Sequence, residues 1–271
     1  MPSRLSGWRI VCLCCVACLP LVAVADSLDD GSERTLPAIA LIIDDLGNQR
    51  VPGRRAVTLP GPVACAFLPN GPYTRELARR AHAGQKEVML HLPMQALETE
   101  ARKAEPDELT LDMTRSQFRA TIEQDIAAVP YASGLNNHQG SLLTRHPGNM
   151  AWLMQAISEH GKLFFIDSRT TSATVARQLA QEYGIPNSER NVFLDNEARP
   201  EAVRAKFREL VRLARRDGTA LGIGHPHPAT LEVLVDELNN LDDHGVQLIP
   251  VARLIELQNN RQLVWHTSSS R

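Results

Sequence analysis

The sequence has few aromatic residues, little cysteine and no excess of charge of either sign. Aromatic residues make up 4% of its 271 residues, which argues against a broad stacking platform for bases or long glycans. The 29 basic and 31 acidic residues nearly cancel, so there is no electrostatic case for nucleic-acid binding. Nucleotide binding is unsupported because Gly-x-x-x-x-Gly-Lys-Ser/Thr and Gly-x-Gly-x-x-Gly are both missing, and the lack of Gly-x-Ser-x-Gly disfavours a serine hydrolase.

The first 25 residues have the pattern of an export signal. Arg4 and Arg9 precede an apolar run that ends in Ala23-Val24-Ala25, a small-x-small cleavage pattern. The run is short for a membrane span. We therefore expect cleavage near Ala25 and a mature chain in the periplasm or outside the cell, with no transmembrane span. An uncleaved N-terminal anchor and a lipoprotein site at Cys18 are the alternatives.

The rest of the chain is expected to form one large domain. Residues 26–36 are polar and acidic and predict a flexible lead-in, residues 37–260 the domain, and residues 261–271 a C-terminal tail. Cys65 is the single cysteine beyond the signal, so the mature chain forms no internal disulfide and depends on a packed core. The charged segment 98–112 is a loop that could cover a site.

Short apolar runs alternate with amphipathic stretches along the domain, which is typical of an α/β fold with a mostly parallel sheet. Thr114 and Gln117 form a capping-box pattern at the start of one expected helix. Eight expected strands favour a closed or nearly closed barrel, and an open doubly wound sheet is the alternative. The expected strands cover residues 38–43, 62–67, 87–91, 133–135, 163–166, 192–194, 219–223 and 246–249, and the expected helices cover 73–83, 115–128, 148–160, 173–183, 200–216 and 229–244.

Polar clusters follow five of the apolar runs at their carboxyl ends, where parallel α/β folds bind ligands. Asp44 and Asp45 form the first cluster, and burying either without a partner is costly. One could bind a metal while the other acts as a base. In the structural alternative, Asp45 caps a helix and Asp44 takes a hydrogen bond. Because neighbouring strand residues face opposite sides, both serve one site only if the chain turns there, and Gly47 favours a turn.

Histidines mark the second, third and fifth clusters. His91 precedes a proline-bearing turn, and His138 lies in a glycine-bracketed loop beside Asn136 and Asn137, either of which could orient neighbours. A structural histidine and a polar turn are the alternatives. His225 and His227 are each followed by proline, and either could be a general acid or a ligand.

The fourth cluster closes another apolar run with Asp167 and Arg169. Asp167 could orient a metal-bound histidine or bind substrate. Arg169 could instead pair with Asp167 in a structural role.

Together these segments resemble the divergent polysaccharide deacetylase family, a branch of the polysaccharide deacetylase superfamily of carbohydrate esterases. The resemblance covers roughly residues 37–255 and rests on five ordered segments: IIDDLG, MLHLPM, GLNNHQGS, FFIDSRTT and GIGHPHP. It implies a distorted (β/α) barrel of about seven to eight mostly parallel strands, with its site at the strands' carboxyl ends. The implied reaction is the metal-dependent removal of an N- or O-acetyl group from a sugar.

The resemblance also implies roles for individual residues. Asp44 corresponds to the base and Asp45 to a metal ligand. His225 corresponds to the general acid, with His227 as its substitute.

The metal set implied by the resemblance departs from the superfamily in one position. Gln95 stands where the His-x-x-x-His motif has its second histidine. His138 would then complete a set with Asp45 and His91 for a divalent metal, expected to be zinc because such ligands suit it. Residues expected around substrate or behind the ligands are Asn137, Asp167 and Arg169.

Two function classes follow from these residues. The first is a metal-dependent hydrolase that removes acetyl groups from an envelope carbohydrate. The second, favoured by Gln95, is a non-catalytic periplasmic carbohydrate-binding or envelope-interaction protein on the same fold. A metal hydrolase acting on another amide or ester is a third possibility. A carbohydrate is the expected ligand in the first two, and metal content separates them.

Overall fold

The first apolar run of the domain forms the central strand of a parallel sheet. The computed structural model describes residues 36–97 and 107–268, all within one unit of the chain. In it, β1 (Ala38–Leu46) pairs with β2 (Ala64–Phe67), β8 (Thr219–Gly224) and the short β9 (Gln247–Leu248). β1 is buried on both faces, as a near-continuous apolar run predicts for a parallel strand. The expected signal peptide, and the lead-in up to residue 35, lie outside the described residues.

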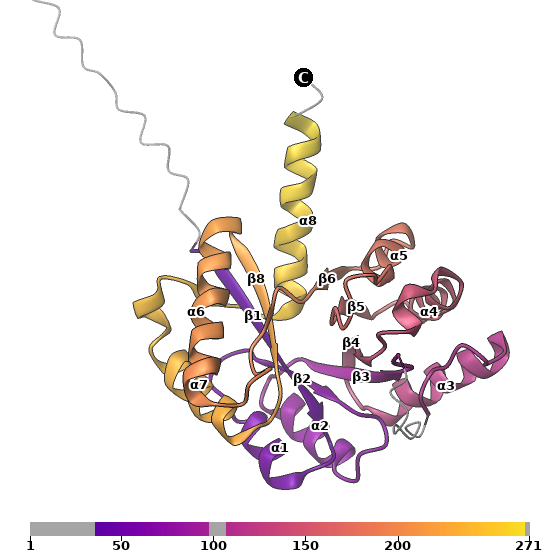
Figure 1. Cartoon of the computed structure of the whole chain (residues 1–271), viewed down its shortest axis with the longest axis horizontal. Helices are drawn as coiled ribbons and strands as arrows, with labels where there is room; N and C mark the ends of the chain where they lie inside the picture. Colours follow the sequence, from indigo (N-terminus) through magenta and orange to yellow (C-terminus); the bar gives the residue numbers. More distant parts are fainter. Residues whose placement is uncertain (1–35, 98–106, 269–271) are drawn as a thin grey trace, which may run out of the picture. The chain divides into compact units, whose positions relative to one another are not determined.

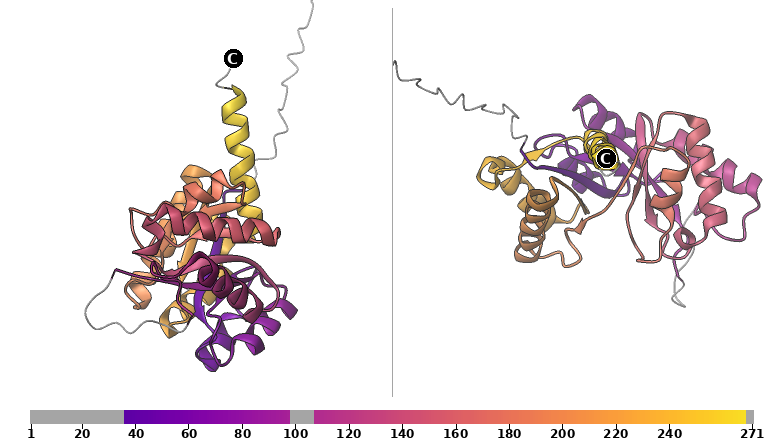
Figure 2. Two further views of the ribbon diagram at one scale, coloured as in Figure 1. Left: turned by 90° about the vertical axis from the view of Figure 1, so that its right-hand side faces the viewer. Right: turned by 90° about the horizontal axis from the view of Figure 1, so that it is seen from above.

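The nine described strands form one curled sheet. Its order is β6-β5-β4-β3-β2-β1-β8-β7, with β9 beside the start of β1, and all of these pairs are parallel. Figures 1 and 2 show the sheet curling into a half-barrel, which confirms the expected distorted (β/α) barrel. The remaining strands are β3 (Val88–Met94), β4 (Ala132–Gln139), β5 (Phe164–Asp167), β6 (Asn187–Glu189) and β7 (Val192–Phe193).

Seven described helices flank the sheet on its outer side (Figure 1). The capping box of α3 is present: Thr114 accepts from the Gln117 backbone N–H, and the Gln117 side chain accepts from the Thr114 N–H. These helices are α1 (Arg50–Ala56), α2 (Thr74–Ala83), α3 (Arg115–Ala128), α4 (Pro147–His160), α5 (Ala176–Glu182), α6 (Pro200–Asp217) and α7 (Pro228–Asn239).

The eighth described helix, α8 (Val251–Ser268), packs against the inner face of the curled sheet. Val251, Leu254 and Ile255 join an inner apolar cluster with side chains from β1, β2, β3, β5 and β8. Figure 2 shows α8 end-on within the curl. The Glu87 carboxylate accepts hydrogen bonds from the backbone N–H groups of Val251 and Ala252, which fixes the start of this helix. The expected boundary between domain and tail at 260/261 falls inside α8.

The inner face of the sheet changes character along the strands. Side chains of alternate residues face the same side of a strand, so Ala40, Ile42 and Asp44 all face inward from β1. Met89 and His91 do the same on β3. The interior is therefore apolar and filled by α8 near the amino-terminal ends of the strands, whereas it is polar near their carboxyl ends. None of the described helices combines the length and apolar character needed to cross a membrane.

Candidate metal centre

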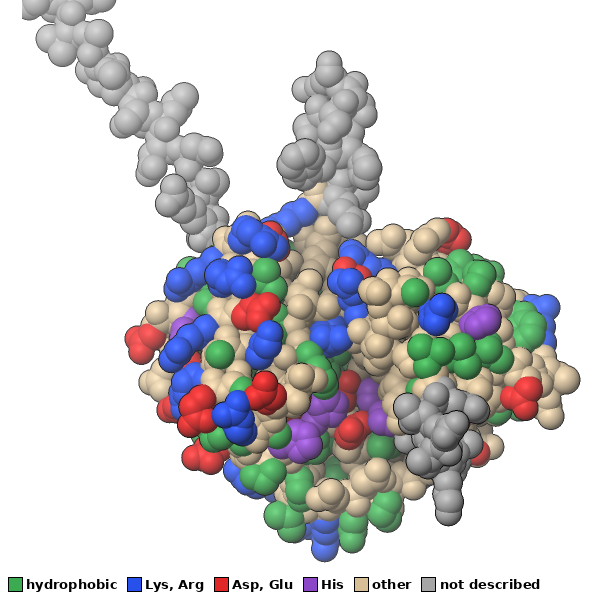
Figure 3. All heavy atoms as spheres, viewed as in Figure 1, with side chains coloured by type: hydrophobic (Ala, Val, Ile, Leu, Met, Phe, Trp, Pro, Cys, Tyr) green, Lys and Arg blue, Asp and Glu red, His purple; other side chains and the backbone are tan. Residues whose placement is uncertain are grey.

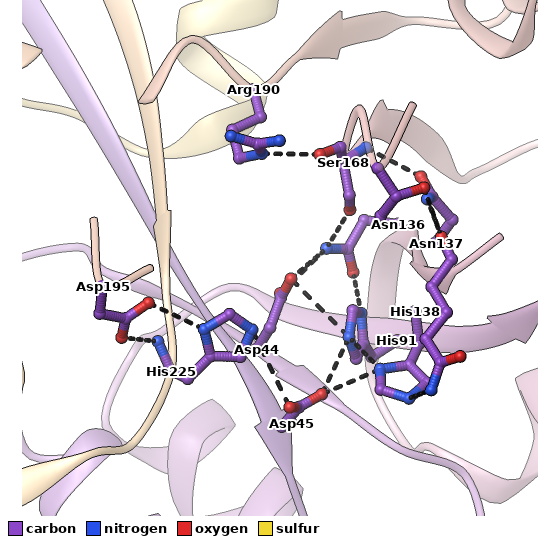
Figure 4. A network of polar contacts seen from close by, with 12 residues as sticks. Asp44, Asp45, His91, Asn136, Asn137, His138, Ser168, Arg190, Asp195 and His225 are labelled. Atoms are coloured by element: carbon purple, nitrogen blue, oxygen red, sulfur yellow. Dashed lines mark hydrogen bonds and ion pairs between the residues drawn. The ribbon is translucent and has the colours of Figure 1, made fainter. Parts of the chain in front are cut away.

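Four inward-facing residues gather where the strands end. Asp44 comes from β1, His91 from β3, Asn136 from β4, and His225 directly follows β8 (Figure 4). In the parallel register, His91 lies beside Asn136 and Pro93 beside His138. His138 follows Asn136 by two residues on β4, so both side chains leave the strand on the same face. Asp44, His91 and Asn136 are all less than 3% exposed. Buried polar groups of this kind need partners, and each finds them within the cluster.

Asp45 reaches the same site because the backbone turns at this residue. Its φ is +56°, a left-handed conformation that is uncommon for residues other than glycine, and the pairing of β1 with β2 shifts between Ile43 and Leu46. Gly47 supports the turn with φ +111°, where a Cβ would lie 2.1 Å from Thr74 Oγ1. The turn allows two adjacent carboxylates to face one centre. Backbone strain of this kind is often found at functional sites.

Three side-chain atoms converge beside Asp44. Asp45 Oδ1 lies 3.0 Å from His138 Nδ1 and 3.2 Å from His91 Nε2, and the two ring nitrogens are 3.0 Å apart. Asp45 Oδ1 is buried, and these two ring nitrogens lie beside it. Ligand atoms bound tetrahedrally at about 2.0–2.1 Å from zinc are separated by about 3.3 Å, close to these spacings. A carboxylate oxygen and two imidazole nitrogens thus fit a divalent metal.

The two imidazoles also control the charge of Asp45. Burial alone would raise its pKa, but His138 and His91 outweigh burial and hold the pKa of Asp45 well below its usual range. Asp45 is therefore ionised, as a metal ligand must be.

The Asn136 side chain connects the carboxylate of Asp44 to the ring of His91. Its Oδ1 lies 3.0 Å from His91 Nδ1, so it accepts that ring's N–H and leaves Nε2 directed at Asp45. Its Nδ2 donates to both oxygens of Asp44, at 2.9 and 3.0 Å, and to Ser168 Oγ. Burial raises the pKa of Asp44 despite the opposing effect of the nearby imidazoles and of Asn136. Asp44 is thus a buried carboxyl with a higher proton affinity than Asp45.

His225 is held by a carboxylate that the sequence analysis missed. Asp195 Oδ1 lies 2.9 Å from His225 Nδ1, while its Oδ2 accepts from the His225 backbone N–H and from Thr230 Oγ1. Burial alone would lower the pKa of His225, but Asp195, and then Asp44, raise it overall. The signal was present in the sequence, since Asp195 closes the apolar run 192–194 just as Asp44 closes 38–43.

The structure separates the two histidines of the fifth cluster. His225 Nε2 lies 3.9 Å from Asp45 Oδ2, on the side of the metal-ligand set. His227 is exposed, its backbone N–H bonds to the His225 carbonyl, and its ring centre lies 5.9 Å from that of His225. Asp195, His225 and His227 form a second group with ligand atoms within 4.8 Å, but Asp195 already accepts three hydrogen bonds.

The remaining predicted residues surround the centre at its β5 side. Asn137 faces away from Asn136: its Oδ1 accepts from the Ser168 N–H at 2.8 Å. Asp167 accepts from the Arg169 backbone N–H and from Thr174 Oγ1, and its described contacts include no histidine. The Arg169 guanidinium pairs with Glu189 at 3.6 Å, not with Asp167.

Gln95 lies apart from the cluster for a geometric reason. A His-x-x-x-His spacing brings two rings together on a helix, but β3 is extended here, so residue 95 lies about 13 Å along the chain from residue 91. The Gln95 Oε1 accepts from the Leu111 N–H, and its backbone bonds to Leu109. Gln95 thus anchors the chain that follows residues 98–106, which lie outside the described residues.

Two cavities open beside the cluster. One of about 380 Å³ is lined by Asp44, His91 and Arg190, and the other, of about 580 Å³, by Asn48, Gln49 and His227. Both share Asp45, His138, Gln139 and His225 in their walls. Figure 3 shows histidine and acidic side chains together in a hollow of that face. The first cavity therefore borders all three metal-ligand candidates, and the second borders Asp45 and His138.

Comparisons with known proteins identify a family and a fold. Residues 41–255 match the family described as divergent polysaccharide deacetylase. The uncharacterized protein YibQ of Escherichia coli (strain K12) is 37% identical over 203 residues, which cover 75% of this chain but only 63% of that relative.

Two solved structures share the fold. The uncharacterized protein ATU2773 from Agrobacterium tumefaciens C58 has a TM-score of 0.78 at 20% identity, covering 82% of this chain and 91% of that one. A D285S mutant of the peptidoglycan deacetylase PdaC from Bacillus subtilis has a TM-score of 0.53 at 11% identity, covering 86% and 97%.

Proposed function

The chain belongs to the divergent polysaccharide deacetylase family, and on that premise we propose that it is a metal-dependent hydrolase removing acetyl groups from an envelope carbohydrate. The observation that carries the proposal is the convergence of Asp45, His91 and His138 beside the buried carboxyl of Asp44. Three protein ligands are typical of catalytic zinc sites, which keep a fourth position for water or substrate. We propose zinc as the metal because its preferred ligands are those present.

Asp44 is the general base in this proposal. A divalent metal bound by the three ligands would acidify a bound water and polarise the acetyl carbonyl. The Asp44 carboxylate accepts the proton of the attacking water, and its raised pKa suits that task because a base works best near the operating pH. Asn136 holds both oxygens of Asp44 in place during the transfer.

His225 is the general acid. Its Nδ1–H donates to Asp195, which fixes the ring so that Nε2 points to the side of the cluster that Asp45 occupies. The protonated ring gives its proton to the departing nitrogen or oxygen of the sugar. Asp195 favours the protonated form, because a nearby carboxylate raises the pKa of an imidazole. The exposed His227 remains the second candidate for this role.

We further propose that the protein acts in the cell envelope. The support is the sequence of residues 1–25, with its basic start, apolar run and small-x-small end. Mass spectrometry of the protein recovered from the envelope tests this. A mature chain that begins at Asp26 supports export with cleavage, one that begins at Met1 favours the uncleaved anchor, and absence of the protein from the envelope fraction contradicts the proposal.

Metal content and acetate release test the catalytic proposal together. The purified protein is incubated with zinc and desalted, and its metal content is measured by mass spectrometry. We expect about one zinc per chain, lost in His91→Ala and in His138→Ala. His82→Ala is the matched control, since that histidine lies on α2 and stacks on Tyr131 at 3.9 Å.

The outcomes separate the candidate functions. Zinc binding together with acetate release from N-acetylglucosamine oligomers supports the deacetylase. Zinc binding with hydrolysis of other amides or esters alone favours a different metal hydrolase. A protein that retains no zinc and releases no acetate contradicts the proposal and favours a non-catalytic carbohydrate-binding protein.

A further inference from the structure

One wall of the 380 Å³ cavity is cationic. Arg169 and Arg190 line it, and so do Asp44 and His138. Figure 4 shows Arg190 beside Ser168, on the far side of Asn136 from His138. Asp45 belongs to the proposed set of metal ligands, and Asp44 is the proposed general base. Arg169 pairs with Glu189 at 3.6 Å, so Arg190 is the arginine of this wall with no ion-pair partner among the described residues.

Arg190 is fixed in position by its own contacts. Its Nε donates to the Ser168 carbonyl at 2.6 Å, and its Nη2 donates to the Arg169 carbonyl at 2.8 Å. Its guanidinium also lies over the Phe193 ring, 5.0 Å from the ring centre. A side chain held in this way loses little conformational entropy when a ligand binds.

Arg190 has no carboxylate partner among the described residues. Nearby acids are engaged elsewhere: Glu189 pairs with Arg177 at 2.9 Å, and Asp167 is bound by Thr174 and the Arg169 N–H. A guanidinium has five N–H donors, and the bonds to the Ser168 and Arg169 carbonyls use the one donor of Nε and one of the two donors of Nη2. Both donors of Nη1 and one of Nη2 are left for another acceptor.

A half-buried cation with no ion-pair partner in contact is unfavourable. Burial, followed by the charge of Arg169, lowers the pKa of the Arg190 guanidinium, although the charges of Asp44 and Asp167 oppose this effect. Water can satisfy the free donors, but it brings no negative charge. A ligand oxyanion would supply both hydrogen-bond acceptors and charge, and a planar guanidinium binds carboxylate or phosphate through two parallel bonds.

We propose that Arg190, assisted by Arg169, forms a binding site for an acidic group of the saccharide, so that this protein selects anionic over neutral sugars. Phe193 adds an aromatic surface to the same wall. The inference deepens the proposed function and rests on it, because the site adjoins the metal-ligand cluster. Carboxylate and phosphate share the chemistry, and the test below separates them.

The test measures binding of four matched sugars by ligand-observed NMR. They are N-acetylglucosamine, N-acetylglucosaminuronic acid, the methyl ester of that acid, and N-acetylglucosamine 6-phosphate, which differ only at carbon 6. Chelator-treated full chain is used, since a carboxylate would otherwise also bind the metal. We expect at least one charged sugar to bind about tenfold to a hundredfold more tightly than the neutral sugar and the ester.

Substitutions identify the residue responsible. Arg190→Gln should remove the preference and leave the Kd for N-acetylglucosamine unchanged. Arg190→Lys should restore part of it, since Lys keeps the charge but not the planar fork. Arg119→Gln is the control, because Arg119 is an exposed arginine of α3 that pairs with Glu123 and Glu159.

Each result decides between binding and a purely structural role. If the wild-type protein binds all four sugars equally, the proposal is wrong. It is also wrong if Arg190→Gln weakens neutral and charged sugars to the same extent, as a residue that only holds the 168–169 turn would. These Kd values do not depend on hydrolysis. If the protein releases no acetate but binds the charged sugar more tightly, the deacetylase proposal is wrong and the proposed site for an acidic group still holds. Acetate release together with equal Kd values for neutral and charged sugars overturns the acidic site alone.

Discussion

Both carboxylate oxygens of Asp44 accept hydrogen bonds from Asn136 Nδ2, at 2.9 and 3.0 Å. The same carboxamide accepts the Nδ1–H of His91 through its oxygen. One buried side chain on β4 therefore sets the position of the proposed base on β1 and the tautomer of a metal-ligand candidate on β3. The proposed metal site and the proposed base are held as one unit.

Substitution of Asn136 should affect metal affinity and turnover together. Asn136→Ala leaves His91 Nδ1 without its acceptor and Asp44 without its donor. We expect zinc affinity to fall about 10- to 100-fold, and kcat to fall as well. Competition with a chelating dye measures the first and acetate release the second. Unchanged affinity for zinc would show that Asn136 does not orient His91.

Asp44→Asn should separate metal binding from catalysis. Asn has the same shape but cannot accept a proton, so kcat should fall by about 10²- to 10⁴-fold. Zinc content should stay near the wild-type value, because Asp44 lies outside the set of three ligands. Acetate release and metal content are measured on the same preparation. A variant with full activity would exclude Asp44 as the base.

Asp195→Asn should impair the acid step. The substitution removes the charge that favours protonated His225 and leaves the hydrogen bond to its Nδ1 weaker. We expect kcat to fall about 10²-fold or more, within the usual range for loss of acid–base assistance, while zinc remains bound. The comparison with His225→Ala is decisive. If Asp195 acts through His225, the double variant is no slower than His225→Ala alone.

Asp125 should make the folded state less stable as the pH rises. It lies on α3 at 0% exposure, and both its carboxylate oxygens lack hydrogen-bond partners. Burial, with a contribution from Asp107, raises the pKa of Asp125 from 3.8 to about 8. The folded chain therefore keeps a proton that the unfolded chain loses above about pH 4, so the free energy of unfolding falls between about pH 4 and pH 8.

Asp125→Asn should flatten that decline. The amide has no charge to bury, so we expect the variant to be more stable than wild type by roughly 1–3 kcal/mol at pH 8, with little difference near pH 4. Urea unfolding at several pH values checks this. Asp243→Asn, at an exposed position, serves as the control. A pH profile identical to that of wild type would contradict the buried, protonated state.

Gln95→His should not create an additional metal ligand. The extended backbone of β3 carries position 95 away from His91, and the Gln95 side chain contacts Leu111. We expect unchanged zinc stoichiometry and affinity, with some loss of stability because the Leu111 N–H loses its acceptor. Metal titration and thermal unfolding check the two parts. A large gain in zinc affinity would mean that the segment from 95 to 111 can rearrange around a metal.

The sequence predicted the strands that are apolar and missed the one that is not. All eight expected runs coincide with strands, and β1, β2, β3, β5 and β8 are the ones buried on both faces, where parallel strands are apolar. β6 was missed since Asn187, Ser188 and Glu189 carry no such pattern. α8 was missed because the contacts that its described side chains make with the apolar interior come from residues 251–257, too short a run to give a clear helical pattern. α1 contains Pro52 and Gly53, which argue against a helix in sequence terms.

The sequence predicted which residues gather at the site but not which of them contact one another. Strand ends identified Asp44, His91, His138 and His225 as neighbours, because parallel strands end at one edge. Their pairing depends on register, which the sequence does not reveal: His91 lies beside Asn136 rather than Asn137. The turn at Asp45 was required by the two adjacent carboxylates, yet its location depended on a backbone conformation that few non-glycine residues adopt.

The position of β1 at the centre of the sheet has a consequence for how the protein is made. Along one side β1 pairs with β2, which follows it within 30 residues, but along the other it pairs with β8, which begins at Thr219. During synthesis the segment AIALII therefore remains without its β8 partner until most of the domain has been translated, and its first residues pair with β9 later still. His225 emerges directly after β8, so the strand that pairs along the whole of AIALII also brings the last side chain of the centre. Premature termination before residue 219 should thus yield an aggregation-prone chain rather than a partly active one.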